Sequence, residues 1–172
     1  LDAQITQGID ANKSINLART LAYAYEELGD IDKATFWKNK LLRSLPKEDR
    51  IFVREELVHL YTEKAMYDKA IKTLKEGLLE RAGLKPSVSK KDDARLYSQL
   101  GKISLLKKEP RTAEEYFEKA YEDAPKDSWL CYNAGIAYRD IGKKDEALRW
   151  LKRSSELGED RADQALKELE KK

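Results

Sequence analysis

A unit of 34 residues recurs four times in this chain of 172 residues. Four alanines in the same place of each copy anchor the repeat, and they define the units 15–48, 51–84, 94–127 and 128–161. The last two units abut, whereas the segment 85–93 is inserted before the third. A fixed period of this length is typical of an array in which each unit is one supersecondary element that buries its apolar face against its neighbours.

Each unit is predicted to form two helices. Apolar residues recur at helical spacing in the first half of a unit, as at Leu21 and Tyr25. A turn signal such as Gly142 follows, and then a second amphipathic stretch begins. In the first and third units this stretch runs up to Pro46 and Pro125, which end a helix because the residue before a proline avoids the helical region.

Small residues recur where the two helices of a unit must touch. The eighth position of the units holds Ala22, Val58, Gly101 and Gly135, and the twentieth holds Ala34, Ala70, Ala113 and Ala147. A glycine in mid-helix costs about 1 kcal/mol relative to alanine. Gly101 and Gly135 therefore predict close contact between neighbouring helices.

A 34-residue helix pair of this form resembles the tetratricopeptide repeat. The resemblance covers four units, and each supplies residues of the family pattern. They are Leu21, Tyr25, Gly29, Ala34 and Pro46 in the first unit, Leu57, Tyr61, Ala70 and Leu74 in the second, Leu100, Gly101, Ala113, Phe117, Ala120 and Pro125 in the third, and Gly135, Tyr138, Gly142, Ala147 and Leu151 in the fourth. The departures are Lys38 in place of a large apolar residue, Ser104 in place of the aromatic, and Ala65 and Lys108 in place of the turn glycine.

The resemblance implies an all-α fold, a right-handed superhelical solenoid of antiparallel helix pairs forming a single domain over 1–172. Residues 1–14 are expected to be the remnant helix of a preceding repeat. The segment 162–172 is amphipathic and predicts a final capping helix with a polar outer face. The inserted segment 85–93 is expected to be an exposed, solvated loop, and a binding element is the alternative.

The composition excludes several classes of function. Lys+Arg 34 and Asp+Glu 32 nearly cancel to a net charge of +2, which argues against nucleic-acid binding driven by net charge. The single cysteine, Cys131, falls at a packing position and excludes an internal disulfide. No apolar run approaches the ~20 residues that a membrane span requires.

Catalytic constellations are missing from the sequence. His59 is the only histidine, and with Glu55 four residues before it a surface pair is the expected arrangement. The sequence contains no glycine-rich phosphate loop and no nucleophile elbow. We therefore expect no enzymatic activity, metal or cofactor, and a function carried by the surface.

The surface that the resemblance singles out is the inner face, which the first helices of the repeats line. The residues carried over to it as a peptide-binding groove are Arg19, Tyr23, Phe52, Glu55, His59, Arg95, Gln99, Lys102, Trp129, Tyr132, Asn133 and Arg139. Its N-terminal half is acidic through Glu26, Glu27, Glu55, Glu56 and Glu63, and its C-terminal half carries Arg95, Lys102 and Arg139. Trp129 and Tyr132 are the expected anchors, because aromatic residues dominate binding hot spots, and acidic groups of the peptide are expected toward Arg95 and Lys102. The alternative is that some aromatics, Tyr23 and Phe52 above all, fill gaps between neighbouring units.

One subfamily grips the C-terminal carboxylate of heat-shock chaperones with five Lys, Asn and Arg side chains. Those positions hold Arg19, Tyr23, Glu56, Arg95 and Gln99 in the first three units, and Glu55, His59, Gln99, Trp129 and Asn133 in the last three. A glutamate in either set would repel a carboxylate, so a chaperone tail is excluded as the partner.

The leading hypothesis is a non-catalytic scaffold that binds a protein or peptide in this groove. The alternatives are a regulatory or substrate-recognition segment of a larger enzyme or envelope assembly and, less favoured, an RNA-binding protein. Self-association through Leu1 and Ile5 is a further option. Because the chain begins at Leu1 rather than Met, we expect a processed protein or a segment of a longer one. Cytoplasm is the default compartment, and the bacterial periplasm or cell envelope is the alternative.

Overall fold

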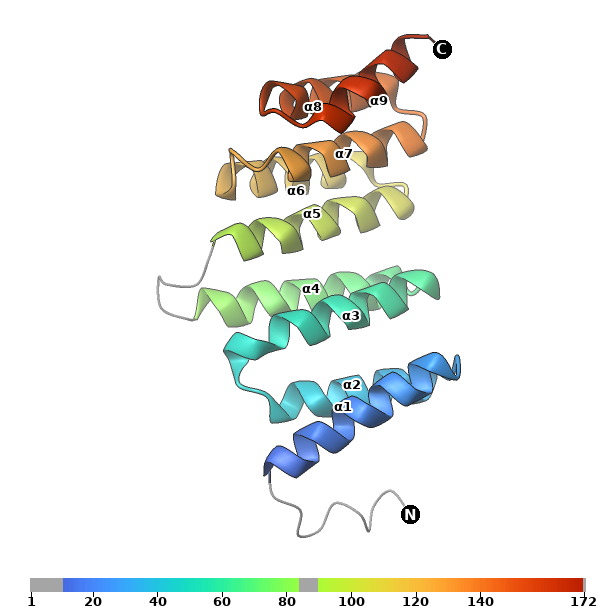
Figure 1. Ribbon diagram of the computed structural model, residues 1–172, viewed down its shortest axis with the longest axis vertical. Helices are drawn as coiled ribbons and strands as arrows, with labels where there is room; N and C mark the ends of the chain where they lie inside the picture. The colour runs from blue at the N-terminus through green and yellow to red at the C-terminus, as the bar shows by residue number, and fades with distance from the viewer. Residues whose placement is uncertain (1–10, 84–89, 172) are drawn as a thin grey trace. The chain divides into compact units, whose positions relative to one another are not determined.

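The computed structural model describes residues 11–83 and 90–171, and all regular elements in these ranges are helices (Figure 1). In chain order they are α1 (Ala11–Glu27), α2 (Ile31–Ser44), the 3-10 turn η1 (Lys47–Asp49), α3 (Arg50–Glu63), α4 (Tyr67–Ala82), α5 (Lys90–Leu106), α6 (Pro110–Asp123), α7 (Ser128–Asp140), α8 (Lys144–Glu156) and α9 (Asp160–Glu170). The predicted all-α class is confirmed, and each predicted repeat contains one pair of helices joined by a short turn.

The helices group into two compact units, residues 1–80 and 81–172. In the first unit α1 packs on α2, and α2 packs on α3. In the second unit α5 pairs with α6, α7 pairs with α8, and α9 covers α8. The pairing follows chain order because the connecting turns are short, which makes consecutive helices antiparallel neighbours.

Two predicted boundaries differ in the structure. Residues 11–14 form the first turn of α1, so they belong to the first repeat rather than to a preceding helix. Residues 1–10, with Leu1 and Ile5, lie outside the described residues, as do 84–89 of the inserted segment. Residues 90–93 of that segment are helical, and they form the first turn of α5. The capping helix α9 begins at Asp160 and buries Ala162, Ala165 and Leu169 under a polar face, as expected.

The start of α5 has an electrostatic cause. Asp92 and Asp93 lie in its first turn, where negative charge is favourable because the helix dipole places positive partial charge there. Both carboxylates also pair with the buried Arg81, with 3.3 Å between Arg81 Nη2 and Asp92 Oδ2. Favourable interactions of Asp92 and Asp93 with the helix dipole and with Arg81 therefore stabilise the helical conformation of residues 90–93.

The turn between the two helices of a repeat has the same backbone in all four copies. Its central residue is left-handed in each: Gly29 (φ 71°), Ala65 (φ 54°), Lys108 (φ 63°) and Gly142 (φ 75°). The next residue donates its N–H to the carbonyl five positions back, as Glu109 does to Ser104 at 2.9 Å and Lys143 to Tyr138 at 3.0 Å. This is the Schellman arrangement, which satisfies carbonyls left open at the helix end. Ala65 and Lys108, which replace the turn glycine, therefore raise the conformational free energy of the turn but do not change its backbone shape.

Replacing Lys108 by glycine is expected to stabilise the protein by about 0.5 to 1 kcal/mol. A side chain in the left-handed region costs about 1 to 2 kcal/mol, and part of this gain is offset because glycine has more freedom when unfolded. Gly142→Ala, at the equivalent place of the next repeat, is the control and should destabilise. Urea unfolding followed by circular dichroism measures both changes, and shifts of equal sign would contradict the interpretation.

The mid-helix glycines lie where the sequence predicted close contact. A Cβ atom added to Gly101 would lie 2.6 Å from Cε1 of Phe117, and one added to Gly135 would lie 2.6 Å from Cγ of Leu151. Both distances are shorter than any side chain tolerates without movement. The second helix of each pair thus inserts a large apolar side chain into the space that the missing Cβ leaves.

Candidate functional site

The first unit displays most of its predicted groove residues to solvent. Tyr23 is 64% exposed on α1, Phe52 is 63% exposed on α3, and the side chain of His59 is 71% exposed. Arg19 is also exposed, whereas Glu55 is half-buried and engaged with a partner. Tyr23 and Phe52 therefore do not fill gaps within this unit.

A buried lysine changes the predicted acidic character of this unit. The Nζ atom of Lys38 lies 2.9 Å from Oε2 of Glu26, and it also donates to Oε2 of Glu56. Burial alone would lower the pKa of Lys38, but the hydrogen bonds to Glu56 and Glu26 raise it above its ordinary value. Two of the five glutamates expected to form an acidic surface therefore serve to hold Lys38, the residue that replaces a large apolar side chain.

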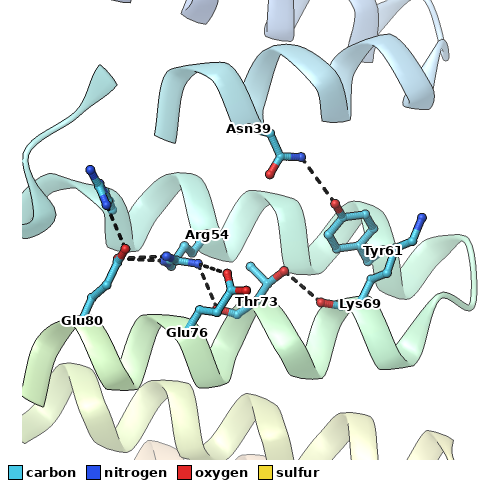
Figure 2. A network of polar contacts seen from close by, with 8 residues as sticks. Asn39, Arg54, Tyr61, Lys69, Thr73, Glu76 and Glu80 are labelled. Atoms are coloured by element: carbon cyan, nitrogen blue, oxygen red, sulfur yellow. Dashed lines mark hydrogen bonds and ion pairs between the residues drawn. The ribbon is translucent and has the colours of Figure 1, made fainter. Parts of the chain in front are cut away.

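The orientation of α3 is set by a polar network on its other side (Figure 2). The buried Arg54 donates to Thr73 O and Glu76 Oε2, both at 3.2 Å, and pairs with Glu80 Oε2 at 2.9 Å. Arg50 reaches the second oxygen of Glu80 at 2.8 Å. Because α3 turns about 100° per residue, Phe52 and the residues four and seven positions beyond it lie opposite Arg54. The network thus fixes which side of α3 is displayed.

In the second unit the structure brings together four of the predicted residues from α5 and α7. Lys102 Nζ donates to Oδ1 of Asn133 at 3.1 Å, and Nδ2 of Asn133 donates to the carbonyl oxygen of Trp129 at 2.9 Å. The ring of Trp129 stacks on that of Tyr132, with 5.5 Å between centroids and 20° between planes. Trp129 keeps 45% of its surface exposed. We call Lys102, Trp129, Tyr132 and Asn133 the α5–α7 site.

Arg161 of α9 completes this site, although the sequence pointed to no role for it. Its guanidinium lies 4.4 Å from the ring centroid of Trp129 and 5.3 Å from that of Tyr132, and Glu159 holds it through two hydrogen bonds. Such contacts stabilise a cation on an aromatic face. The 34-residue period could have pointed to this role. When the period is continued past residue 161, it predicts the first helix of a further repeat where α9 begins.

The remaining predicted residues of the second unit interact with protein groups outside the α5–α7 site. Arg139 pairs with Asp140 at 2.9 Å, and Arg95 faces Asp92 at 3.6 Å within its own helix. Gln99 is half-buried and engaged with a partner. Their guanidinium and amide groups are therefore less available to a ligand than the groups of the α5–α7 site.

Groups capable of catalysis are dispersed or inert in the part of the chain that the structure describes. Cys131 is buried, and desolvation raises the pKa of its thiol to about 11, which suppresses the nucleophilic thiolate. His59 Nδ1 lies 3.6 Å from Oε1 of Glu63, a carboxylate that the sequence interpretation had not paired with it. Among the described residues, no three side chains of His, Cys, Asp and Glu gather where they could hold a metal ion.

Comparison with known proteins agrees with the observed fold. Residues 104–169 match a model of the tetratricopeptide repeat family. The solved structures that resemble the chain include MamA, with 19% identity, a TM-score of 0.62, and 92% of this chain and 81% of that chain covered. BtubC from P. vanneervenii is 19% identical with a TM-score of 0.64, covering 86% and 70%. YrrB, described as a TPR protein with an unusual peptide-binding site, is 22% identical with a TM-score of 0.53, covering 91% and 73%. No curated protein matches the chain.

Residues 104–169 match the tetratricopeptide repeat family by sequence, and the helix pairs of the chain resemble the fold of solved structures of that class. Proteins of this class generally act as protein-interaction scaffolds. None of the described helices is long and apolar enough to cross a membrane.

Proposed function

We propose that this chain is a non-catalytic interaction module that binds a peptide segment of a partner protein on the first helices α5 and α7 of its second unit, with Trp129 and Tyr132 as the anchor. The observation that carries the proposal is the stacked, half-exposed aromatic pair on α7. Aromatic side chains supply much apolar contact area at little conformational cost, which is why they recur at binding hot spots.

The surroundings of the pair support a binding role over a packing role. A side chain that served only the core would be buried, as Trp37 and Trp150 are at 4% and 1% exposure. Trp129 instead presents nearly half of its surface beside polar groups of α5 and α7. A few convergent polar groups next to an apolar surface are typical of ligand sites.

RNA binding is less supported by the charges of the site. Arg139 and Arg161 are held by Asp140 and Glu159, so their charges are largely compensated within the protein. Binding to a phosphate backbone needs several cations that release counterions together. The module is therefore better suited to a protein ligand.

Trp129→Ala is expected to abolish capture of the natural partner from a lysate of the source organism. Loss of a hot-spot aromatic costs at least about 2 kcal/mol, which is a loss of about 30-fold in affinity. Phe36→Ala is the matched control, because Phe36 is an aromatic residue 58% exposed on α2, a second helix. Both variants should first show unchanged helical circular dichroism.

Mass spectrometry of the captured proteins decides between the outcomes. Partners that the native chain and Phe36→Ala retain, and that Trp129→Ala loses, support the proposal. The same partners in all three samples would show that another surface carries the function. Because only Trp129 of the three tryptophans is substantially exposed, protection of its fluorescence from acrylamide by the captured partner gives an independent readout of contact at the site.

A further inference from the structure

The ammonium group of Lys102 is incompletely satisfied within the described residues. Lys102 is half-buried on α5, and its one hydrogen bond there goes to the neutral amide oxygen of Asn133 at 3.1 Å. Lysine has three N–H donors, so two of them have no protein acceptor in the described part of the chain. The buried Lys38 of the first unit, by contrast, is neutralised by two glutamates.

The charge of Lys102 is only partly compensated within the described residues. Burial lowers the pKa of Lys102, which Asp140 opposes through its charge, and Asp140 itself is bonded to Arg139. A partly desolvated cation whose charge is only partly compensated, as by the distant Asp140, gains stability once an anion pairs with it directly. An anionic group of a ligand would therefore pair favourably with Lys102.

We infer that Lys102 binds a carboxylate of the peptide that Trp129 and Tyr132 anchor, so that the ligand carries an aspartate or glutamate beside an apolar residue. The inference rests on the proposed function and names the chemistry of its ligand. Asn133 provides the spatial link, because its amide contacts both the ammonium of Lys102 and the backbone of Trp129. The acidic and the apolar side chains of the ligand must therefore be near neighbours.

A carboxylate fits this position better than a phosphate group. Phosphate recognition commonly uses the planar fork of arginine, which donates two parallel hydrogen bonds. The arginines near the site, Arg139 and Arg161, direct their forks to Asp140 and Glu159. What remains is one ammonium group, whose single positive charge is balanced by one carboxylate, whereas a phosphate group carries a charge of about −1.5 to −2.

A displayed library of random peptides, selected on the full chain, tests the inference. The native protein is expected to enrich peptides with Asp or Glu next to an aromatic or aliphatic residue. Selection on Lys102→Met should lose the acidic preference, and the affinity of a native-selected peptide should fall at least about tenfold, as for loss of one charge-assisted hydrogen bond. Lys152→Met is the matched control, because it removes an exposed lysine from α8, and it should leave both results unchanged.

The outcomes separate this inference from the function on which it rests. Peptides that require Trp129 but show no acidic preference would overturn the role of Lys102 and leave the proposed function standing. Failure to select any peptide, or selection indifferent to Trp129→Ala, would overturn both. The thermal midpoint adds a readout without ligand: Lys102→Met should unfold at a higher temperature than the native chain. A lower midpoint would assign Lys102 a structural role and contradict the inference.

Discussion

Phe117→Ala is expected to destabilise the second unit by about 3 to 5 kcal/mol, as large-to-small changes of buried aromatic residues do. Phe117 is 1% exposed. The centroid of its ring lies 5.6 Å from the ring centroid of Tyr138 and 6.0 Å from that of Trp150. It also fills the space beside Gly101. Urea unfolding measures the loss, and native-state hydrogen exchange should locate it in α5 to α9.

Because Phe117 contacts Gly101, the effect of a substitution at Gly101 is expected to depend on Phe117. Gly101→Ala in the native chain should destabilise, because its Cβ would lie 2.6 Å from the ring and overpacking costs about 1 to 3 kcal/mol. In the Phe117→Ala background the obstruction is gone, and the higher helix propensity of alanine should then stabilise by up to about 1 kcal/mol. A double-mutant cycle measures the difference. An effect of Gly101→Ala that is equal in both backgrounds would contradict the close-packing explanation.

Arg54→Ala is expected to cost the first unit about 3 kcal/mol, toward the lower end for breaking a buried ion pair because Glu76 is half exposed. The substitution removes contacts to Thr73, Glu76 and Glu80, and it leaves Glu80 with Arg50 alone (Figure 2). Denaturant unfolding checks the value. Arg19→Ala removes an exposed arginine of α1 and should change stability by less than about 0.5 kcal/mol.

The same network predicts how stability depends on acid. Burial alone would raise the pKa of Glu80, but its bonds and charge interactions with Arg54 and Arg50 hold the pKa below its usual value. The folded state therefore binds this proton less readily than the unfolded state. The stabilisation is complete above the ordinary glutamate pKa and is lost as the pH falls through the lowered value. Arg54→Ala should show a shallower loss between neutral and acid pH, and an unchanged slope would argue against the role of the pair.

The repeat, its helix pairs and the places of close contact could be predicted from the sequence. Gly101 and Gly135 were informative because a mid-helix glycine is unfavourable unless the missing Cβ is needed, and the structure shows Phe117 and Leu151 in that space. The interior placement of Cys131 followed from its position in the repeat. These features depend on periodicity, which a sequence displays directly.

The departures from the pattern were harder to interpret, because each is compensated by residues far away in sequence. Lys38 occupies an apolar position and forms ion pairs with Glu26 and Glu56. These two glutamates of the expected acidic surface are therefore neutralised within the protein. Lys108 takes a glycine's backbone conformation, since the hydrogen bond that closes the turn involves only backbone groups. The repeat period alone does not predict which charged side chains form ion pairs with each other.

The candidate site shows the same division. Periodicity placed Lys102 on α5 and Trp129, Tyr132 and Asn133 on α7, because residues at fixed positions of a repeat share a face. It did not show that Asn133 joins Lys102 to Trp129, nor that Arg95 and Arg139 turn to their own neighbours. Side-chain rotamers and partners decide these points, and they depend on the packed neighbours.

The sequence by itself determined that this protein consists of helix pairs that resemble the tetratricopeptide repeat, because small and apolar residues spaced by 34 positions recur where the two helices of a pair touch. Only the tertiary structure decided which charged side chains are paired with opposite charges inside the protein and which are not. Lys38 and Arg54 are neutralised by glutamates, whereas Lys102 is not. The physical reason is that pairing depends on distances of a few ångströms between side chains of different helices, which no single stretch of sequence contains.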